Sequence, residues 1–464
     1  MKRKFTALIA LTLALTCSAS FLTACKKNDQ KDTFEETINW DNIDWEGNKD
    51  SSKKITVYIS NDLQHYYDPK IEAFEKTYPQ YEVSVHWGAA GDGVKTEQTT
   101  AISTGNPPDL ILGGDVHIEN QKGFLLPLNK LMERDKEEVK PDDFLDGLIE
   151  PLTSGEGIYY LPTTFNVSVL MYNKGLFDKD NVEYPTADWT FDDFVAAGKQ
   201  LTKYDSRGVA TQWGNQTITE WWTQWYSMLT MDGGSLYNDE GYVTLNNEAG
   251  IRALTNWRSL AGAQGATLSD FPDKIGTHNG SDGGSLGNFA GGKVAMLYSA
   301  SCGELMTFSN ANIDFDIAPL PKSTVTNGRS GAELSITAYG IHKNSKNKKG
   351  AWQLLKYLTA PRTDLEELGD FALAAPRKSE RDLLLAVPKA ERTTKYKNLE
   401  VIYDAVSVNK ALPRVSYFEE VTLQYLVKEV NKLLENKSLS VAAAAKAAED
   451  TANSYISYRY KSGF

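Results

Sequence analysis

The residues of this chain best suited to binding chemistry form a dense group of indole rings at positions 220–225 (EWWTQW). On a helix, Trp221 and Trp225 share one face and Trp222 lies beside it. Core packing is the usual role of such an aromatic stripe, but three indoles with interleaved polar side chains are hard to bury together. We therefore expect one or two rings, Trp222 and Trp225, to stack against a ligand.

No catalytic or metal-binding motif accompanies this cluster. Residues 287–294 (GNFAGGKV) come close to a phosphate-binding loop, but Val294 stands where a magnesium-holding Ser or Thr is needed. The five histidines are scattered and form neither an H-E-x-x-H motif nor a zinc cluster, and no G-x-S-x-G occurs. We therefore expect a protein without a cofactor.

The elements that must position binding residues begin with an alternating pattern. Strands are predicted at 54–59, 81–87 and 109–112, with helices at 68–78 and 94–103 between them. This β-α-β-α-β order predicts a mostly parallel sheet with helices on both faces. Ligands bind outside the carboxyl ends of such strands, where Asp62 and Gln64 follow the first strand and Asp115 the third. Asp62 has the alternative role of a turn or helix cap.

The rest of the chain is predicted to be mainly helical between 189 and 300, with a strand at 313–317 and a helix at 351–358. Helices broken near Asn436 follow from 419 to 460, because residues 442–448 have very high helix propensity.

The N-terminus has the order of a secretory signal peptide: a basic start, an apolar run over 5–15 and small residues before Cys25. Residues 22–25 (LTAC) resemble the lipobox of bacterial lipoproteins, which implies cleavage of residues 1–24 and a lipid on Cys25. An ordinary signal peptide or an N-terminal membrane helix is the alternative. Residues 25–53 are polar and predict a flexible, lipidated tether. The aromatic region around Trp45 is the exception, and a contact between it and the folded part of the chain is the alternative.

The net charge and the cysteine content exclude some classes of protein. The formal net charge is −12, and removal of three basic residues with the signal peptide brings it near −15. That balance argues against nucleic acid as a partner. Cys302 is the only cysteine after Cys25, so the mature chain has no intrachain disulfide. No later segment has 18 consecutive apolar residues.

Several short motifs occur in an order that identifies a family. They are found at 107–109 (PPD), 123–128 (GFLLPL), 159–162 (YYLP), 170–177 (LMYNKGLF), 190–194 (TFDDF), 289–296 (FAGGKVAM), 317–321 (IAPLP) and 374–377 (AAPR). This series resembles the extracellular sugar-binding lipoproteins of ABC importers, the group that includes maltose-binding protein. The resemblance spans roughly residues 54–425.

The resemblance implies an α/β, two-lobed, periplasmic-binding-protein-like fold of type II, each lobe a mostly parallel sheet flanked by helices, with the ligand cleft between the lobes. We expect residues 54–164 and 313–372 in the N-terminal lobe. Residues 165–312 and 373–464 then form the C-terminal lobe. Lobe closure around a ligand is a hinge motion.

The resemblance also implies which side chains contact sugar. Besides Asp62, Gln64, Asp115, Trp222 and Trp225, it points to Asn166, Ser301, Glu333, Arg377 and Tyr417. Asn166 has the alternative of a structural strand or hinge residue, and Arg377 that of a structural ion pair. Small residues at 299–302 stand where maltose-binding protein has an aromatic, which favours a roomier pocket or a close backbone contact. Cys302 is expected to be a buried small residue.

The function that follows is that of a monomeric, non-enzymatic, substrate-binding lipoprotein of an ABC transporter. It captures a sugar or oligosaccharide and delivers it to a membrane permease, while anchored on the extracellular face of a single-membrane bacterium. The alternatives are an exported glycoside hydrolase, which needs two carboxylates about 5–10 Å apart, and a surface carbohydrate adhesin or signalling receptor.

Overall fold

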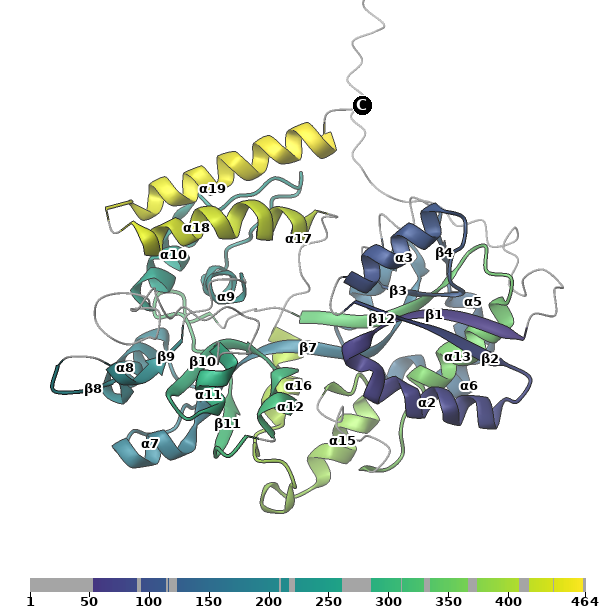
Figure 1. The fold of residues 1–464 in the computed structure, drawn as a ribbon, viewed down its shortest axis with the longest axis horizontal. Coiled ribbons are helices and arrows are strands. Elements are labelled where there is room, and N and C mark those ends of the chain that lie inside the picture. The colour runs from purple at the N-terminus through teal and green to yellow at the C-terminus, as the bar shows by residue number, and fades with distance from the viewer. Residues whose placement is uncertain are drawn as a thin grey trace, which may run out of the picture.

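A computed structural model shows two lobes that share one long strand (Figure 1). It describes residues 53–89, 93–113, 116, 123–207, 210–216, 222–260, 285–309, 311–328, 334–365, 374–408, 417–436 and 438–461. The predicted signal peptide, Cys25 and the tether up to residue 52 lie outside the described residues. No helix within the described ranges is both long and apolar enough to cross a membrane.

The first lobe begins with the predicted β-α-β-α-β unit, which the structure confirms. Its elements are β1 (Lys54–Ser60), η2 (Asn61–Leu63), α2 (Gln64–Thr77), β2 (Glu82–Gly88), α3 (Gly93–Ser103) and β3 (Leu110–Leu112). Strand β1 lies between β2 and β3 and is parallel to both. Helix α2 starts four residues earlier than predicted, because Tyr67 adds a turn to the buried face formed with Ile71 and Phe74.

Two antiparallel strands complete the sheet of this lobe. Strand β12 (Leu334–His342) pairs with β3, and β7 (Tyr160–Asn173) pairs with β12. The remaining elements here are β4 (Leu125–Leu126), α5 (Asn129–Arg134), α6 (Lys136–Val139), η3 (Pro141–Asp143), η4 (Glu150–Leu152), β5 (Thr153–Ser154), β6 (Gly157–Ile158) and α13 (Lys348–Thr359). In this lobe only the β1–β2 and β1–β3 pairings are parallel, because β12 is antiparallel to both of its long neighbours, β3 and β7.

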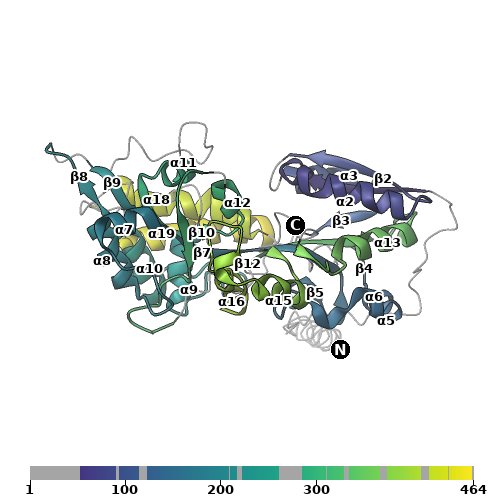
Figure 2. The ribbon, with the colours of Figure 1, turned by 90° about the horizontal axis from the view of Figure 1, so that it is seen from below.

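Strand β7 carries the chain from one lobe to the other (Figures 1 and 2). Its residues 160–167 pair with β12, and residues 168–173 pair with β10 and β11 in the second lobe. That lobe contains α7 (Lys174–Asp180), α8 (Phe191–Leu201), β8 (Lys203–Tyr204), β9 (Ala210–Asn215), α9 (Thr223–Met231), α10 (Glu248–Leu260), α11 (Ser285–Ala290), β10 (Val294–Ser301), α12 (Glu304–Ser309) and β11 (Phe315–Ala318). Helix α8 begins with a capping box formed by Thr190 and Asp193.

Strand β11 lies in the second lobe, although residues from 313 onward were predicted in the first. It pairs with residues 170–173 of β7. Phe315 and Ile317 are buried in one cluster with Met171 of β7, so hydrophobic contact holds this strand in the second lobe. The chain therefore returns to the first lobe with β12, about 20 residues later than predicted.

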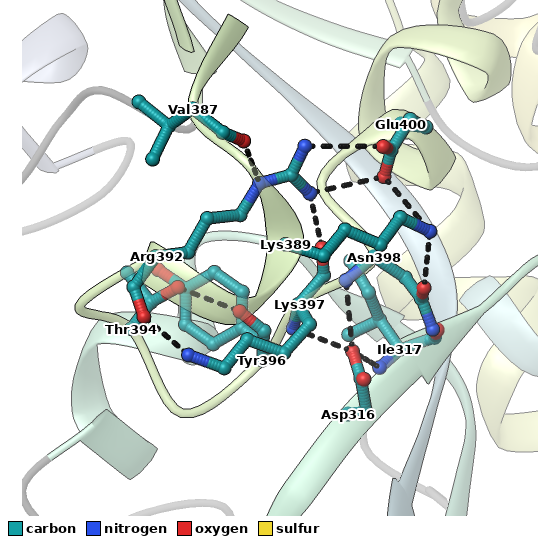
Figure 3. Close-up of polar contacts among 10 residues, drawn as sticks. All are labelled: Asp316, Ile317, Val387, Lys389, Arg392, Thr394, Tyr396, Lys397, Asn398 and Glu400. Carbon is teal, nitrogen blue, oxygen red and sulfur yellow. Dashed lines mark hydrogen bonds and ion pairs between the residues drawn. The ribbon is translucent and has the colours of Figure 1, made fainter. Parts of the chain in front are cut away.

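A third connection runs from α13 through α15 (Lys378–Ala386) and η8 (Lys389–Glu391) to α16 (Glu400–Val408). Helix α15 is tied to the first lobe, because Glu380 pairs with Arg362 at 2.6 Å. The loop after it is tied to the second lobe (Figure 3). There Asp316 of β11 accepts hydrogen bonds from the backbone N–H groups of Lys397 and Asn398 at 3.0 and 3.1 Å.

The C-terminal helices cover the second lobe beside α10 (Figure 1). They are α17 (Phe418–Val421), the π-helical η9 (Thr422–Leu426), α18 (Val427–Glu435), α19 (Val441–Ile456) and the π-helical η10 (Ser457–Lys461). The predicted break at Asn436 is confirmed. Each lobe has its own buried core, and a third buried cluster beside β7 joins Phe165 and Leu334 to Phe315 of the second lobe.

Candidate functional site

The edge of the sheet that faces the second lobe collects the ends of several strands. Strands β3 and β7 both run antiparallel to β12, so they run parallel to each other and to β1. This edge holds Asn61 after β1, Gly113 after β3 and Asn166, near the end of the β7 segment that pairs with β12. Ligands of open α/β sheets bind at such an edge.

Asn166 and Ser301 meet at the point where β7 passes between the lobes. The Asn166 side chain donates from Nδ2 to Ser301 Oγ at 2.5 Å, although 134 residues separate the two in sequence. Asn166 lies at the end of the segment paired with β12, and Ser301 pairs with Ser168 at the start of the segment paired with β10. Both side chains are half-buried. The structure thus brings together two of the predicted site residues.

The turn after β10 completes this cluster. Gly303 donates its N–H to Asn166 Oδ1 and to Ser301 Oγ, each at 3.2 Å, and the Cys302 thiol donates to Asn166 Oδ1 at 3.0 Å. Cys302 is itself buried, as predicted. We call Asn166, Ser301, Cys302 and Gly303 the crossing cluster. All four residues are uncharged, so the cluster is suited to a neutral polar ligand.

A β-bulge aims Ser301 at Asn166. The register between β10 and β7 shifts between Leu297 and Ala300, and Ser299 at the bulge has a φ of 56°. A non-glycine residue with positive φ is uncommon and is often found at a binding site. Ser299 Oγ lies 2.6 Å from Ser227 Oγ of α9, a buried contact that holds the bulge. Without the extra residue, Ser301 would face the opposite side of the sheet.

Strand β12 adds two hydroxyls that the sequence did not single out. Ser335 pairs with Asn166 and Thr337 pairs with Thr164, so these side chains share one face of the sheet. Ser335 and Thr337 are half-buried. Polar and apolar residues alternate over 334–338, which indicates a strand with one polar face. Only the pairing with β7 shows that this polar face is the one that carries Asn166.

Trp222 and Trp225 lie inside the second lobe. Trp222 exposes 2% of its surface and Trp225 1%, and both belong to the large core cluster of that lobe. The Trp222 ring packs edge-on against the Phe418 ring, with 5.3 Å between the ring centroids. The structure therefore favours core packing for these two rings. Trp221 lies outside the described residues.

Arg377 and Tyr417 are also buried and structural. Arg377 donates from Nη1 to the carbonyls of Val139 and Lys140 and from Nε to that of Thr359, and its guanidinium lies 3.7 Å from the Phe144 ring centroid. Burial lowers the Arg377 pKa to about 10. The structural alternative stated for Arg377 is thus favoured, with carbonyl groups as its main partners.

Tyr417 is 5% exposed and donates its hydroxyl to the Gly241 carbonyl at 2.7 Å. Burial raises the pKa of this hydroxyl. Gln64 is exposed at the start of α2, where its Nε2 donates to Asp68 at 2.9 Å. Asp115, Glu333 and the Asp62 side chain lie outside the described residues. Among the described residues, no group of three or more His, Cys, Asp or Glu side chains is arranged to hold a metal ion.

Comparison with known proteins extends these observations. The family model for bacterial extracellular solute-binding proteins matches residues 60–364. A protein of Brucella abortus (strain 2308), named provisionally as a binding protein, is 26% identical over 301 residues, which are 63% of this chain and 68% of that protein. The arabinooligosaccharide-binding protein of Halalkalibacterium halodurans is 27% identical over 158 residues, 33% of each chain.

Solved structures share the fold over most of the chain. The ABC substrate-binding protein of Listeria monocytogenes in complex with cycloalternan superposes with a TM-score of 0.71 and 24% identity, covering 87% of this chain and 98% of that one. The sugar-binding protein MalE of Xanthomonas citri gives a TM-score of 0.71 at 18% identity, covering 88% and 98%. With the family model matched over residues 60–364, this chain belongs to the bacterial extracellular solute-binding protein family.

Proposed function

We propose that this protein binds a sugar or oligosaccharide between its lobes, with the crossing cluster as the polar centre of the site. The observation that carries the proposal is the Asn166–Ser301 contact where β7 leaves the first lobe. A ligand held there touches both lobes at once, and it favours the arrangement in which both reach it.

The hydrogen-bonding capacity of the pair fits hydroxyl groups. An amide nitrogen has two N–H donors, and Asn166 uses one of them on Ser301. Within the described residues, neither the second Nδ2 hydrogen nor the Ser301 hydroxyl hydrogen has an acceptor. The cluster therefore offers two neighbouring donors to sugar hydroxyl oxygens, and Ser335 and Thr337 add hydroxyls on the same face.

The relatives support a sugar over other solutes. Cycloalternan is bound by the Listeria monocytogenes protein, and arabino-oligosaccharides are named for the Halalkalibacterium halodurans relative. A relative in Sinorhizobium fredii is instead named for amino-acid transport, with 24% identity over 208 residues. A free amino acid carries two charges that need charged partners, and the crossing cluster is neutral, so we favour sugar.

The wider role we propose is capture without chemical change. The protein would bind sugar on the extracellular face of the membrane, held there by a lipid on Cys25, and pass it to the permease of an ABC importer. We also propose that four further residues contact the sugar at the edge where the strands end: Asp62, Gln64, Asp115 and Glu333. The family of binding proteins supports a role without catalysis.

A thermal-shift screen tests this function. The purified chain is heated with cycloalternan, maltotetraose, arabino-oligosaccharides, tagatose and a set of amino acids. At 100 times its dissociation constant, a ligand stabilises the fold by about 2.7 kcal/mol. We expect a rise in melting temperature with a sugar, and recovery of that sugar intact by chromatography. A rise with amino acids alone contradicts the sugar proposal, and the appearance of shorter saccharides contradicts the non-enzymatic role.

A further inference from the structure

A hollow lies at the end of the first lobe opposite the crossing cluster. It has a volume of about 490 Å³ and is formed by residues between 54 and 58 of β1, residues 84–86 of β2 and the loops before β3 and α13. The lining residues that matter below are Lys54, Tyr58, His86, Pro107, Pro108 and Lys346. Ligand pockets commonly have volumes of about 300–1,000 Å³, so this hollow is large enough to take a small molecule.

The hollow exists because one face of the sheet is not fully covered at this end. Ile55, Val57 and Ile59 of β1 are fully buried in the core that contains α2. Tyr58, on the alternate face, is half-buried, and its partner His86 on β2 is exposed. Parallel sheets are normally covered on both faces, so the exposed face at this end is an unusual feature that a further segment could complete.

The lining combines aromatic, apolar and cationic character. The Tyr58 and His86 rings lie 4.3 Å apart, and Pro107 and Pro108 add apolar surface. Lys346 is exposed and has no hydrogen bond or ion pair to any described residue. The Asp109 carboxylate at the same hollow is already bonded to Thr56 and to Ser345. The chemistry that fits is an aromatic segment carrying negative charge.

We propose that residues 39–46 of this same chain (NWDNIDWE) occupy the hollow. Its Trp40 and Trp45 would pack against the Tyr58 and His86 rings and the two prolines. Its acidic residues, Asp41, Asp44 and Glu46, would pair with Lys346. The described part of the chain begins beside the hollow, because the Lys53 carbonyl accepts the Glu82 N–H of β2 at 2.8 Å. Six residues separate Glu46 from Lys53 and span up to about 20 Å, enough to turn back onto the sheet.

Docking of residues 39–46 changes what the tether does. Between Cys25 and β1, residues 26–53 can extend to roughly 90 Å, whereas residues 26–38 alone can extend to roughly 40 Å. The docked segment would hold the first lobe closer to the membrane and fix which end of that lobe faces it. This inference rests on the hollow and on the sequence before it, and it stands independently of the ligand.

Hydrogen exchange measured by mass spectrometry on the exported chain, with the segment before Lys53 intact, tests the proposal. We expect amides of residues 39–46 to exchange at least roughly tenfold more slowly than in an unstructured peptide. Lys346→Glu should remove most of that protection, and Lys349→Glu, at an exposed lysine outside the hollow, should leave it unchanged. Replacing Trp40 and Trp45 by Ala should also speed exchange at residues 105–109.

Three results would overturn the proposal. Exchange of residues 39–46 at the rate of an unstructured peptide would exclude docking. Equal effects of Lys346→Glu and Lys349→Glu would exclude the hollow as the docking site. Loss of protection on dilution would show that the segment of a second copy occupies the hollow instead. All variants keep the crossing cluster. The melting temperature of each variant checks that it is folded.

Discussion

Replacing Asn166 by Ala removes the centre of the proposed site with little damage to the fold. Asn166 supplies one donor to the ligand and holds Ser301 Oγ at 2.5 Å. A neutral hydrogen bond contributes about 0.5–1.5 kcal/mol, so loss of both effects costs about 1–3 kcal/mol of binding. That range corresponds to a roughly 5- to 150-fold rise in Kd. Stability should fall by less than about 1.5 kcal/mol, because Gly303 is exposed to water and its N–H keeps Ser301 Oγ as an acceptor.

Isothermal titration calorimetry with the sugar that gives the largest thermal shift measures this effect. Asn312→Ala, at an exposed position before β11, is the matched control and should bind as the wild type does. Ser301→Ala and the double variant complete a mutant cycle. Because Asn166 orients Ser301, the double variant should bind more tightly than the sum of the two single losses predicts.

A wild-type Kd for Asn166→Ala, with an unchanged melting temperature, would refute the reasoning. It would mean that the Asn166–Ser301 contact is not part of the ligand site. Strict additivity in the cycle would refute the claim that Asn166 positions Ser301, while leaving both as separate contacts.

Three further predictions concern residues around the site and core. Trp225→Ala should cost about 3–5 kcal/mol of stability in urea unfolding, because the ring is 1% exposed, while sugar affinity of the folded protein changes little; a large loss of affinity would show that the ring contacts ligand. Ser299→Val should weaken sugar binding roughly tenfold by calorimetry, because a β-branched residue resists a φ of 56°, whereas Ser299→Gly loses the contact with Ser227 but adopts this φ without strain and should weaken binding less; equal affinities of the two variants would contradict this. Burial lowers the His342 pKa to about 4, so the folded state resists the proton that the unfolded chain binds below its usual pKa near 6.5. The stability that this residue contributes is full above pH 6.5 and falls between pH 6.5 and 4. In urea unfolding at these two pH values, His342→Gln should reduce the loss in the free energy of unfolding by up to about 3 kcal/mol; a loss as large as in the wild type would contradict this prediction.

The fold was largely predictable because local patterns and chain order agree. Strands β1, β2 and β3 have β-branched runs bounded by turn residues, and their alternation with helices predicts parallel pairing. The placement of β11 was not predictable in this way. Its sequence specifies a buried strand, but which lobe buries it depends on contacts with Met171 and other residues far away along the chain.

The site was predictable only where a residue's role follows from its place on a strand. Asn166 lies on the strand expected to cross between the lobes, and its contact with Ser301 agrees with that expectation. The indoles at 222 and 225 were misleading, because burial of a polar–aromatic helix depends on the helices that cover it. Arg377 likewise depends on carbonyls more than 200 residues away, which sequence spacing cannot bring together.

The most direct test of the central claim is a crystal structure of the complex with the sugar that stabilises the chain most. Our account predicts the sugar between the lobes, with hydroxyl oxygens within about 3.2 Å of Asn166 Nδ2 and Ser301 Oγ. A sugar bound elsewhere, with the crossing cluster making only its contacts within the protein, would contradict it.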